Sequence, residues 1–145
     1  MSNIKNIRHI GIVTRDLEKS LNFWTKKMNF SIYKEMIEVG EHIDSITHKK
    51  NTEVRTVKLK DKHNFVIELL DFKNNDSPLI NQKPYSFGIT HIAIEIVDLD
   101  KMYHELKSDG IVFNSKPNIT TDGYAKMVYF EAPDGVFVEL VELLK

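Results

Sequence analysis

Four residues of this 145-residue chain are of types that suit metal chemistry: His9, Glu68, His91 and Glu139. Imidazole nitrogens and carboxylate oxygens are ligands for Zn, Ni, Co, Mn and Fe. Two nitrogen and two oxygen donors leave coordination positions open for water or a substrate, so the set predicts one catalytic divalent metal. Taken singly, each residue is more often an ordinary strand residue. The prediction therefore depends on how the chain arranges all four.

The N-terminal part of the chain is repeated further along. When the sequence is shifted by 82 positions, residues 7–19 fall on residues 89–101 with seven identities in thirteen positions, and His9 meets His91. Both segments begin with a short run rich in isoleucine that is typical of a strand. An aspartate then stands where a helix N-cap belongs, and apolar residues follow at helical spacing. Each segment predicts a strand followed by a helix.

The end of the chain is also a copy of an earlier segment. With a shift of 71 positions, residues 65–72 fall on residues 136–143, and Glu68 meets Glu139. Successive strand residues point to opposite faces of a sheet. The apolar neighbours of each histidine and glutamate therefore face the helices, and the four polar side chains are expected on the opposite face. This two-fold arrangement favours metal ligation over four unrelated coincidences.

The repeat predicts the fold class. We expect an α+β protein made of two tandem βαβββ modules. The modules span about 5–72 and 88–143, the linker 73–87 is exposed, and the whole of 1–145 is a single domain. Strands after each helix are expected at residues 30–36, 53–60, 65–72, 111–117, 125–132 and 136–143.

Composition excludes several classes of function. Hydrophobic residues make up 41% of the chain and charged residues 28%, which is typical of a globular protein. The net charge is −1 and the basic residues form no dense run, so we expect no nucleic-acid partner. There is no cysteine, which excludes disulfides and thiolate ligands. No segment predicts a signal peptide or a membrane span, so a cytoplasmic location is expected.

The duplicated segments HIGIVTRDLEKSLNFW and HIAIEIVDLDKMYHEL, with the endings VIELL and DGVFVELVE, resemble the vicinal oxygen chelate superfamily. This superfamily includes glyoxalase I, methylmalonyl-CoA epimerase, extradiol dioxygenases, fosfomycin resistance transferases and bleomycin-binding proteins. The similarity covers nearly the whole chain, and it implies that the curled mixed sheets of the two modules form a cup around the metal. The full two-histidine, two-glutamate set is most similar to glyoxalase I, with the epimerase next. The segment ELLDF departs from the ELTYN of glyoxalase I, and no glutathione-contacting Arg and Asn are identifiable, so the substrate stays open.

The resemblance implies a lyase or isomerase similar to lactoylglutathione lyase. One divalent metal (Zn, Ni, Co, Mn or Fe) would stabilise an enediolate formed from a small substrate with adjacent oxygens. Glu139 or Glu68 would carry the proton, and the resemblance favours Glu139. An Fe(II) extradiol-type dioxygenase and a non-catalytic binding or resistance protein remain the alternatives. The resemblance also implies a homodimer.

The first module is eleven residues longer between its histidine and its glutamate than the second. The surplus fits residues 40–50, a polar segment that contains two isoleucines three positions apart. It predicts either a solvated surface loop or a short lid or helix at the mouth of the metal site. In the second case its isoleucines would close over the substrate. His42, Asp44 and the nearby Arg55 are the candidate substrate contacts.

Overall fold

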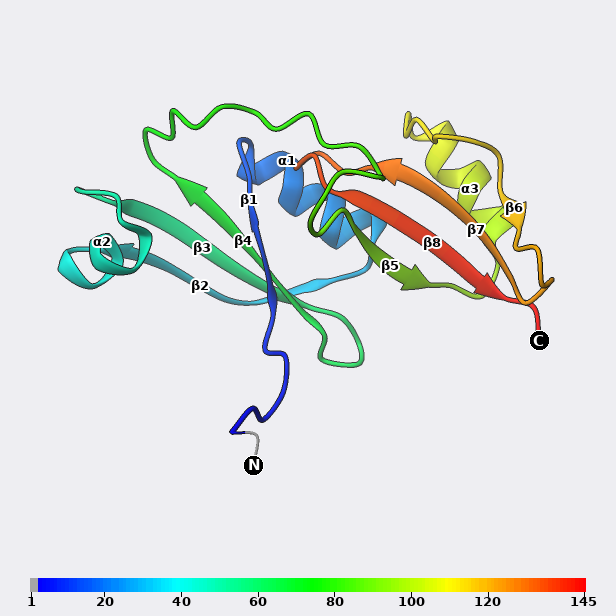
Figure 1. Cartoon of the computed structure of the whole chain (residues 1–145), viewed down its shortest axis with the longest axis horizontal. Coiled ribbons are helices and arrows are strands. Elements are labelled where there is room, and N and C mark those ends of the chain that lie inside the picture. The colour runs from blue at the N-terminus through cyan, green and yellow to red at the C-terminus, as the bar shows by residue number, and fades with distance from the viewer. Residues whose placement is uncertain (1–2) are drawn as a thin grey trace. The chain divides into compact units, whose positions relative to one another are not determined.

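The computed structural model describes residues 3–145, which fall into two compact units, one ending at Pro78 and the other spanning Leu79–Lys145 (Figure 1). The division lies inside the segment predicted as a linker. Unit 1 contains β1 (Ile10–Val13), α1 (Leu17–Asn22), the π-helical turn η1 (Phe23–Lys27), β2 (Ser31–Val39), α2 (Glu41–Thr47), β3 (Glu53–Lys60) and β4 (Val66–Phe72). Unit 2 contains β5 (His91–Glu95), α3 (Leu99–Ser108), β6 (Asn118–Ile119), β7 (Ala125–Glu131) and β8 (Phe137–Leu143).

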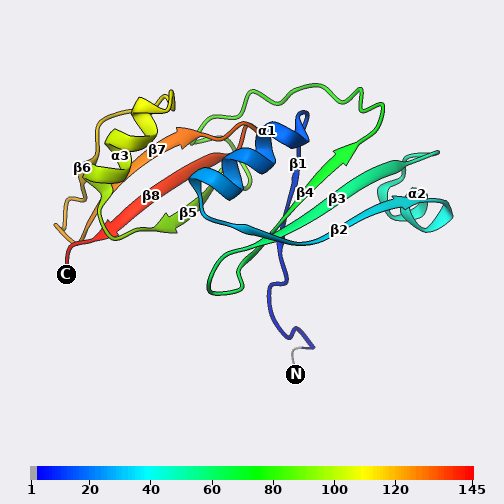
Figure 2. The same cartoon turned by 180° about the vertical axis from the view of Figure 1, so that it is seen from behind.

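Each unit has one four-stranded sheet, and the two sheets have the same topology. The strand order is β1-β4-β3-β2 in unit 1 and β5-β8-β7-β6 in unit 2 (Figures 1 and 2). The first strand of each unit pairs in parallel with the last, and the remaining pairs are antiparallel. The predicted α+β class with two tandem modules is confirmed.

The helix after the first strand begins in the same way in both units. The Asp16 carboxylate accepts a hydrogen bond from the backbone N–H of Lys19 at 3.0 Å, and Asp98 accepts one from Lys101 at 2.9 Å. Each aspartate is thus the N-cap that the sequence predicts. The apolar stripe that follows Asp16 is buried, and within it Trp24 is fully buried. That stripe continues past α1 into η1.

Burial alternates along the strands that form the middle of each sheet. Ile67 and Leu69 on β4 are fully buried, and the intervening Glu68 is partly exposed. On β8, Val138 and Leu140 are fully buried on either side of the partly exposed Glu139. The apolar residues of each strand therefore belong to the core, and the glutamates point to the other face.

One predicted strand is wrong. Residues 111–117 form no strand in the structure, apart from a single bridge between Phe113 and Phe130. The paired segment is the short β6 that follows, and Pro117 directly before it has no backbone N–H to donate to a sheet. Local contacts replace pairing here, because the Asn118 side-chain amide donates to the Lys116 carbonyl at 2.7 Å.

The insertion of the first module folds into a helix. Residues 41–47 form α2, in which Ile43 is buried while Ile46 is 73% exposed. The two isoleucines therefore do not act as one apolar face, because one belongs to the core of unit 1. No helix in residues 3–145 is long and apolar enough to cross a membrane.

Candidate metal centre

In unit 1, β1 and β4 bring a histidine and a glutamate together. The parallel register places Gly11 beside Glu68, and His9 lies directly before β1. The His9 Nε2 atom lies 3.0 Å from Glu68 Oε2, and the side chains are 28% and 13% exposed. Residues two apart on a strand share a face, so the small Gly11 stands next to the pair on the same face. The pair is partly screened from solvent and still reachable from it.

Unit 2 repeats this arrangement on β5 and β8. Ala93 is the register partner of Glu139, as Gly11 is of Glu68. The His91 Nε2 atom lies 3.2 Å from Glu139 Oε2, with side-chain exposures of 37% and 13%. Each unit therefore contains one histidine–glutamate contact, and the two contacts have nearly the same internal geometry.

The separation within each pair fits two ligands of one metal ion. Two donors that each lie about 2.1 Å from a metal are about 3.0 Å apart at a right angle and about 3.4 Å apart at a tetrahedral angle. The observed 3.0 and 3.2 Å match this range, and they also suit a direct hydrogen bond between the two side chains. Within either unit, residues 3–145 contain no group of three or more His, Asp or Glu side chains that could hold a metal. Each unit thus supplies two of the four predicted donors.

The second ring nitrogens of the two histidines have different surroundings. His91 Nδ1 lies 3.0 Å from the Thr90 hydroxyl oxygen, and the ring packs edge-on against Tyr129 with centroids 5.2 Å apart. His9 Nδ1 is buried and has no hydrogen-bond partner among residues 3–145. A partner at this nitrogen fixes the tautomer and orientation of a metal-binding histidine, and the side chain of Thr90 offers such a partner only in unit 2.

Two residues that the sequence prediction missed contact the glutamates. Lys58 Nζ lies 3.2 Å from Glu68 Oε1, and Tyr129 donates a hydrogen bond from its hydroxyl group to Glu139 Oε2 at 3.0 Å. Burial and the Glu139 carboxylate raise the pKa of Tyr129, so its hydroxyl proton is retained. The signal was present in the sequence, because the shift of 71 positions that aligns the glutamates also places Lys58 on Tyr129.

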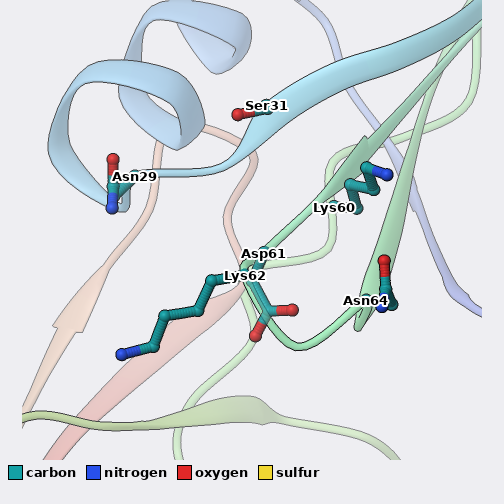
Figure 3. Close-up of a pocket in the computed structure, with 6 residues that line it drawn as sticks. All are labelled: Asn29, Ser31, Lys60, Asp61, Lys62 and Asn64. Atoms are coloured by element: carbon teal, nitrogen blue, oxygen red, sulfur yellow. The ribbon is translucent and has the colours of Figure 1, made fainter.

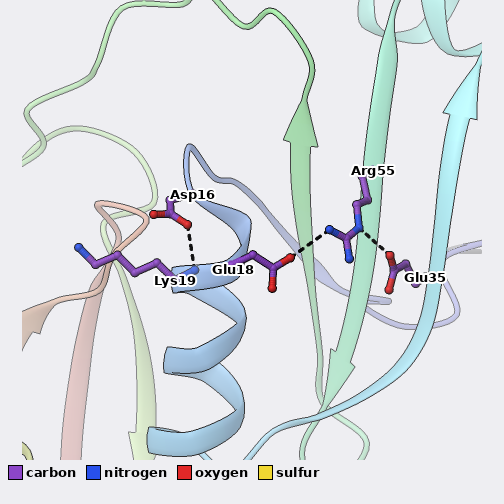
Figure 4. Close-up of polar contacts among 5 residues, drawn as sticks. All are labelled: Asp16, Glu18, Lys19, Glu35 and Arg55. Atoms are coloured by element: carbon purple, nitrogen blue, oxygen red, sulfur yellow. Dashed lines mark hydrogen bonds and ion pairs between the residues drawn. The ribbon is translucent and has the colours of Figure 1, made fainter.

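Arg55, a predicted substrate contact, lies on the other face of the sheet from the His9–Glu68 pair. It is three residues from Lys58 on β3, and strand residues three apart face opposite ways. Its guanidinium group donates to Glu35 at 2.6 Å and to Glu18 of α1 at 3.1 Å (Figure 4). The hydrogen bond to Glu35 is the main reason why the pKa of Arg55 is raised above its ordinary value. Arg55 joins α1 to the sheet.

The two candidate contacts on α2 also have partners within unit 1. The Asp44 carboxylate accepts backbone hydrogen bonds from Asn51 at 2.8 Å and Thr52 at 2.7 Å. The bond from Thr52 is the first cause of the lowered pKa of Asp44. His42 Nε2 lies 3.7 Å from a Glu38 oxygen, and its side chain is 64% exposed. Asp44 therefore holds the loop after α2, whereas His42 is accessible to a ligand.

A polar pocket of about 340 Å³ lies at the turn between β3 and β4. Figure 3 shows the six residues that line it: Asn29, Ser31, Lys60, Asp61, Lys62 and Asn64. The Asp61 carboxylate accepts hydrogen bonds from the backbone N–H groups of His63 and Phe65, which holds the turn. None of the four predicted metal ligands lines this pocket.

Comparison with known proteins gives sequence relatives and structural neighbours of nearly full length. The uncharacterized protein YwkD of Bacillus subtilis is 30% identical over 96% of this chain and 98% of its own length. A probable lactoylglutathione lyase of Vibrio cholerae is 22% identical, with coverage of 98% and 93%. A glyoxalase family protein from Bacillus cereus has a TM-score of 0.86 at 17% identity, with coverage of 100% and 99%. A mutant of the fosfomycin resistance protein FosX from Listeria monocytogenes, in complex with Mn(II) and 1S,2S-dihydroxypropylphosphonic acid, has a TM-score of 0.66 at 18% identity, with coverage of 94% and 89%.

The family profile matches residues 6–140, a segment that includes nearly all of both βαβββ modules and both histidine–glutamate pairs. The mixed sheets, their shared topology and the duplicated pairs agree with this match. The chain belongs to the Glyoxalase/Bleomycin resistance protein/Dioxygenase superfamily.

Proposed function

We propose that the protein is a divalent-metal-dependent lyase or isomerase that moves a proton on a small substrate with adjacent oxygens. The observation that carries this proposal is the duplicated His–Glu pair, at 3.0 Å in unit 1 and 3.2 Å in unit 2. The proposed metal ligands are His9, Glu68, His91 and Glu139. Each histidine–glutamate pair, called a half-site below, fits the spacing of two metal ligands. The probable lactoylglutathione lyase among the relatives supports this class of reaction.

A bound divalent metal would supply a Lewis acid for the negative charge that develops on the substrate oxygens. The proton itself needs a carboxylate near the reacting carbon. Glu139 suits this role better than Glu68, whose two oxygens contact His9 and Lys58 separately. Both contacts of Glu139, from His91 and Tyr129, involve the same oxygen, Oε2. In our proposal Glu139 removes and returns the proton, and the Tyr129 hydroxyl orients its carboxylate.

The test combines metal analysis with turnover. The purified chain should bind close to one equivalent of Mn(II), Ni(II) or Zn(II). The loaded protein should then convert the hemithioacetal of methylglyoxal and glutathione, or exchange an α-proton of a 2-oxo acid or thioester with solvent deuterium. Uptake of oxygen with a catechol would replace the proposal by an Fe(II) dioxygenase. Tight binding of a small molecule without turnover or exchange would replace it by a binding or resistance protein.

The exposed side of α2 belongs to this proposal as a contact for the rest of the substrate. His42 and Ile46 are exposed, whereas Ile43 is buried. Because Ile43 and Asp44 hold the helix and its loop, the sharp experiment changes only the exposed side chains. The double variant His42→Ala/Ile46→Ala should alter KM and substrate selectivity and leave metal binding intact. Unchanged kinetics would reduce α2 to a structural insertion.

A further inference from the structure

Lys58 has an unusual place on the face that carries the His9–Glu68 pair. It is the direct register partner of Glu68 across β3 and β4, and Gly11 is the partner of Glu68 on its other side. The Lys58 side chain is only 16% exposed, and its ammonium group lies 3.2 Å from Glu68 Oε1. A lysine charge is costly to hold away from water unless an anion pairs with it. Within unit 1, Glu68 provides that anion.

The equivalent position in unit 2 has no charge. Lys58 and Tyr129 are related by the same shift of 71 positions that relates Glu68 and Glu139. Both residues lie opposite a glutamate in the register of their sheets. The phenol of Tyr129 is enough to donate a hydrogen bond to Glu139. A lysine in unit 1 is therefore not required to orient a carboxylate, and its charge needs a separate explanation.

A second lysine lies beside Lys58 on the same face. Lys34 on the edge strand β2 is the register partner of Lys58, and residues directly opposite in an antiparallel pair share a face. Lys34 is exposed, and none of the ion pairs within the described part of the chain involves it. Like charges directly opposite each other destabilise a sheet. An anion bound between the two ammonium groups would offset that repulsion.

The charges of the proposed metal-loaded site also favour binding of an anion. If the four proposed ligands hold a divalent metal, its charge and the charges of Glu68 and Glu139 would cancel. The imidazoles and the Tyr129 hydroxyl would add no charge, so Lys58 would leave one positive charge in excess. Once Glu68 shares its charge with a metal, it is a weaker partner for Lys58. An anionic group on the substrate restores the balance.

We propose that Lys58, assisted by Lys34, binds an anionic group of the substrate, a carboxylate or a phosphate-like group attached close to the adjacent oxygens. This inference rests on the proposed function, because it assumes a metal held by the histidine–glutamate pairs. It narrows the substrate class to small organic acids and their phosphate or phosphonate analogues. Neutral diketones and neutral hemithioacetals without a nearby anion are outside it.

The test uses the full chain loaded with Mn(II) and oxalate as the probe, because oxalate has adjacent oxygens and negative charge. Lys58→Met keeps most of the side-chain length and removes the charge. It should bind Mn(II) at least as tightly as the wild type and bind oxalate about 10- to 100-fold more weakly, as expected for loss of a charge-assisted hydrogen bond. Lys58→Arg should retain most of the oxalate affinity. Lys34→Met should show a smaller loss in the same direction.

Lys62→Met is the matched control, since it makes the same change in net charge at the exposed turn between β3 and β4. It should leave both affinities unchanged. Equal oxalate affinity in Lys58→Met and wild type, with Mn(II) binding intact, would overturn the inference alone. A wild-type chain that binds no Mn(II) would overturn the proposed function and this inference together. Oxalate loss of the same size in Lys62→Met would indicate general charge screening, and would also overturn the inference.

Discussion

The histidine–glutamate pairs of the two units have the same strand arrangement and differ in the side chains that contact them. In both units a histidine at the start of the first strand contacts a glutamate in the last, at 3.0 and 3.2 Å. The partner of the glutamate is a lysine in unit 1 and a tyrosine in unit 2. The partner of the second histidine nitrogen is Thr90 in unit 2, and His9 has no such partner within residues 3–145. The two units have the same histidine–glutamate pair and differ in the side chains that contact it.

The largest effect is expected from the histidines, and it tests whether the two half-sites serve one metal. His9→Ala and His91→Ala should each greatly reduce Mn(II) affinity, because each removes a proposed ligand. The loss should exceed the roughly 10- to 100-fold that is typical when a residue that only contacts a ligand is replaced. His104→Ala, on the exposed side of α3, is the control. If only one of the two variants lost metal, one histidine–glutamate pair alone would hold the ion, and the proposal that both histidines bind it would be wrong.

Substitutions of the two glutamates should have different effects, whereas substitutions of the two histidines should have similar effects. Glu139→Gln keeps the shape of the side chain and removes the base, so turnover should fall by about 10²- to 10⁴-fold. Its metal content should fall less than that of His91→Ala. Glu68→Gln should act mainly on metal and substrate affinity, because Lys58 and His9 hold both of its oxygens. Kinetics and metal analysis on both variants decide the matter, and full turnover in Glu139→Gln would exclude it as the base.

A smaller effect should follow from the outer contact of His91. Thr90→Val removes the hydroxyl group 3.0 Å from His91 Nδ1, and we expect metal affinity to fall by about 10- to 100-fold. Arg8 is the repeat equivalent of Thr90, and His9 Nδ1 has no partner within residues 3–145. Arg8→Ala should therefore have little effect on metal affinity measured by titration. Equal losses in both variants would mean that the two histidines are supported alike.

Much of the fold could be predicted because the repeat supplied two copies of each signal. The strand at residues 53–60 coincides with β3, and both aspartate N-caps were found from their place before an apolar stripe. The predicted strand 111–117 is wrong, because its alternation ends in Asn114, Ser115, Lys116 and Pro117, a stretch that forms local contacts instead. A strand in one module was assumed to have an equal in the other, and β6 is far shorter than β2.

The sequence singled out the histidines and glutamates but not the residues that contact them. Residue type and shift pointed to these four residues, since metal ligands are a small set of side chains, and their role as ligands stays a prediction. Arg55 was misleading because a strand arginine gives no sign of which face it takes until its pairing register is known. Lys58 was overlooked in EVRTVKLK for the same reason, since alternating lysines usually mark a solvated face. The structure shows that this lysine is paired with Glu68 and that its side chain is only 16% exposed.

The smallest expected effect compares the two helix N-caps. Asp16→Ala and Asp98→Ala each remove a side-chain acceptor for a backbone N–H, and each should lower the free energy of unfolding by about 0.5–2 kcal/mol. Asp16→Asn and Asp98→Asn are the matched controls, because asparagine caps a helix nearly as well as aspartate does. Thermal and urea unfolding with a probe in each unit would measure the change. Trp24 fluorescence reports on unit 1, and hydrogen exchange along α3 reports on unit 2.

If the two units unfold in one transition, each alanine variant should shift both probes by the same amount. If they unfold separately, Asp16→Ala should move only the Trp24 signal, and Asp98→Ala only the exchange along α3. The asparagine variants should lose no more than a few tenths of a kcal/mol, since the hydrogen bond is kept and only the interaction of the charge with the helix dipole is removed. If an asparagine variant lost as much free energy of unfolding as the alanine variant, the effect of the cap would be due to its charge. The similar N-caps of the two helices would then stabilise them by electrostatics and not by the shared hydrogen bond.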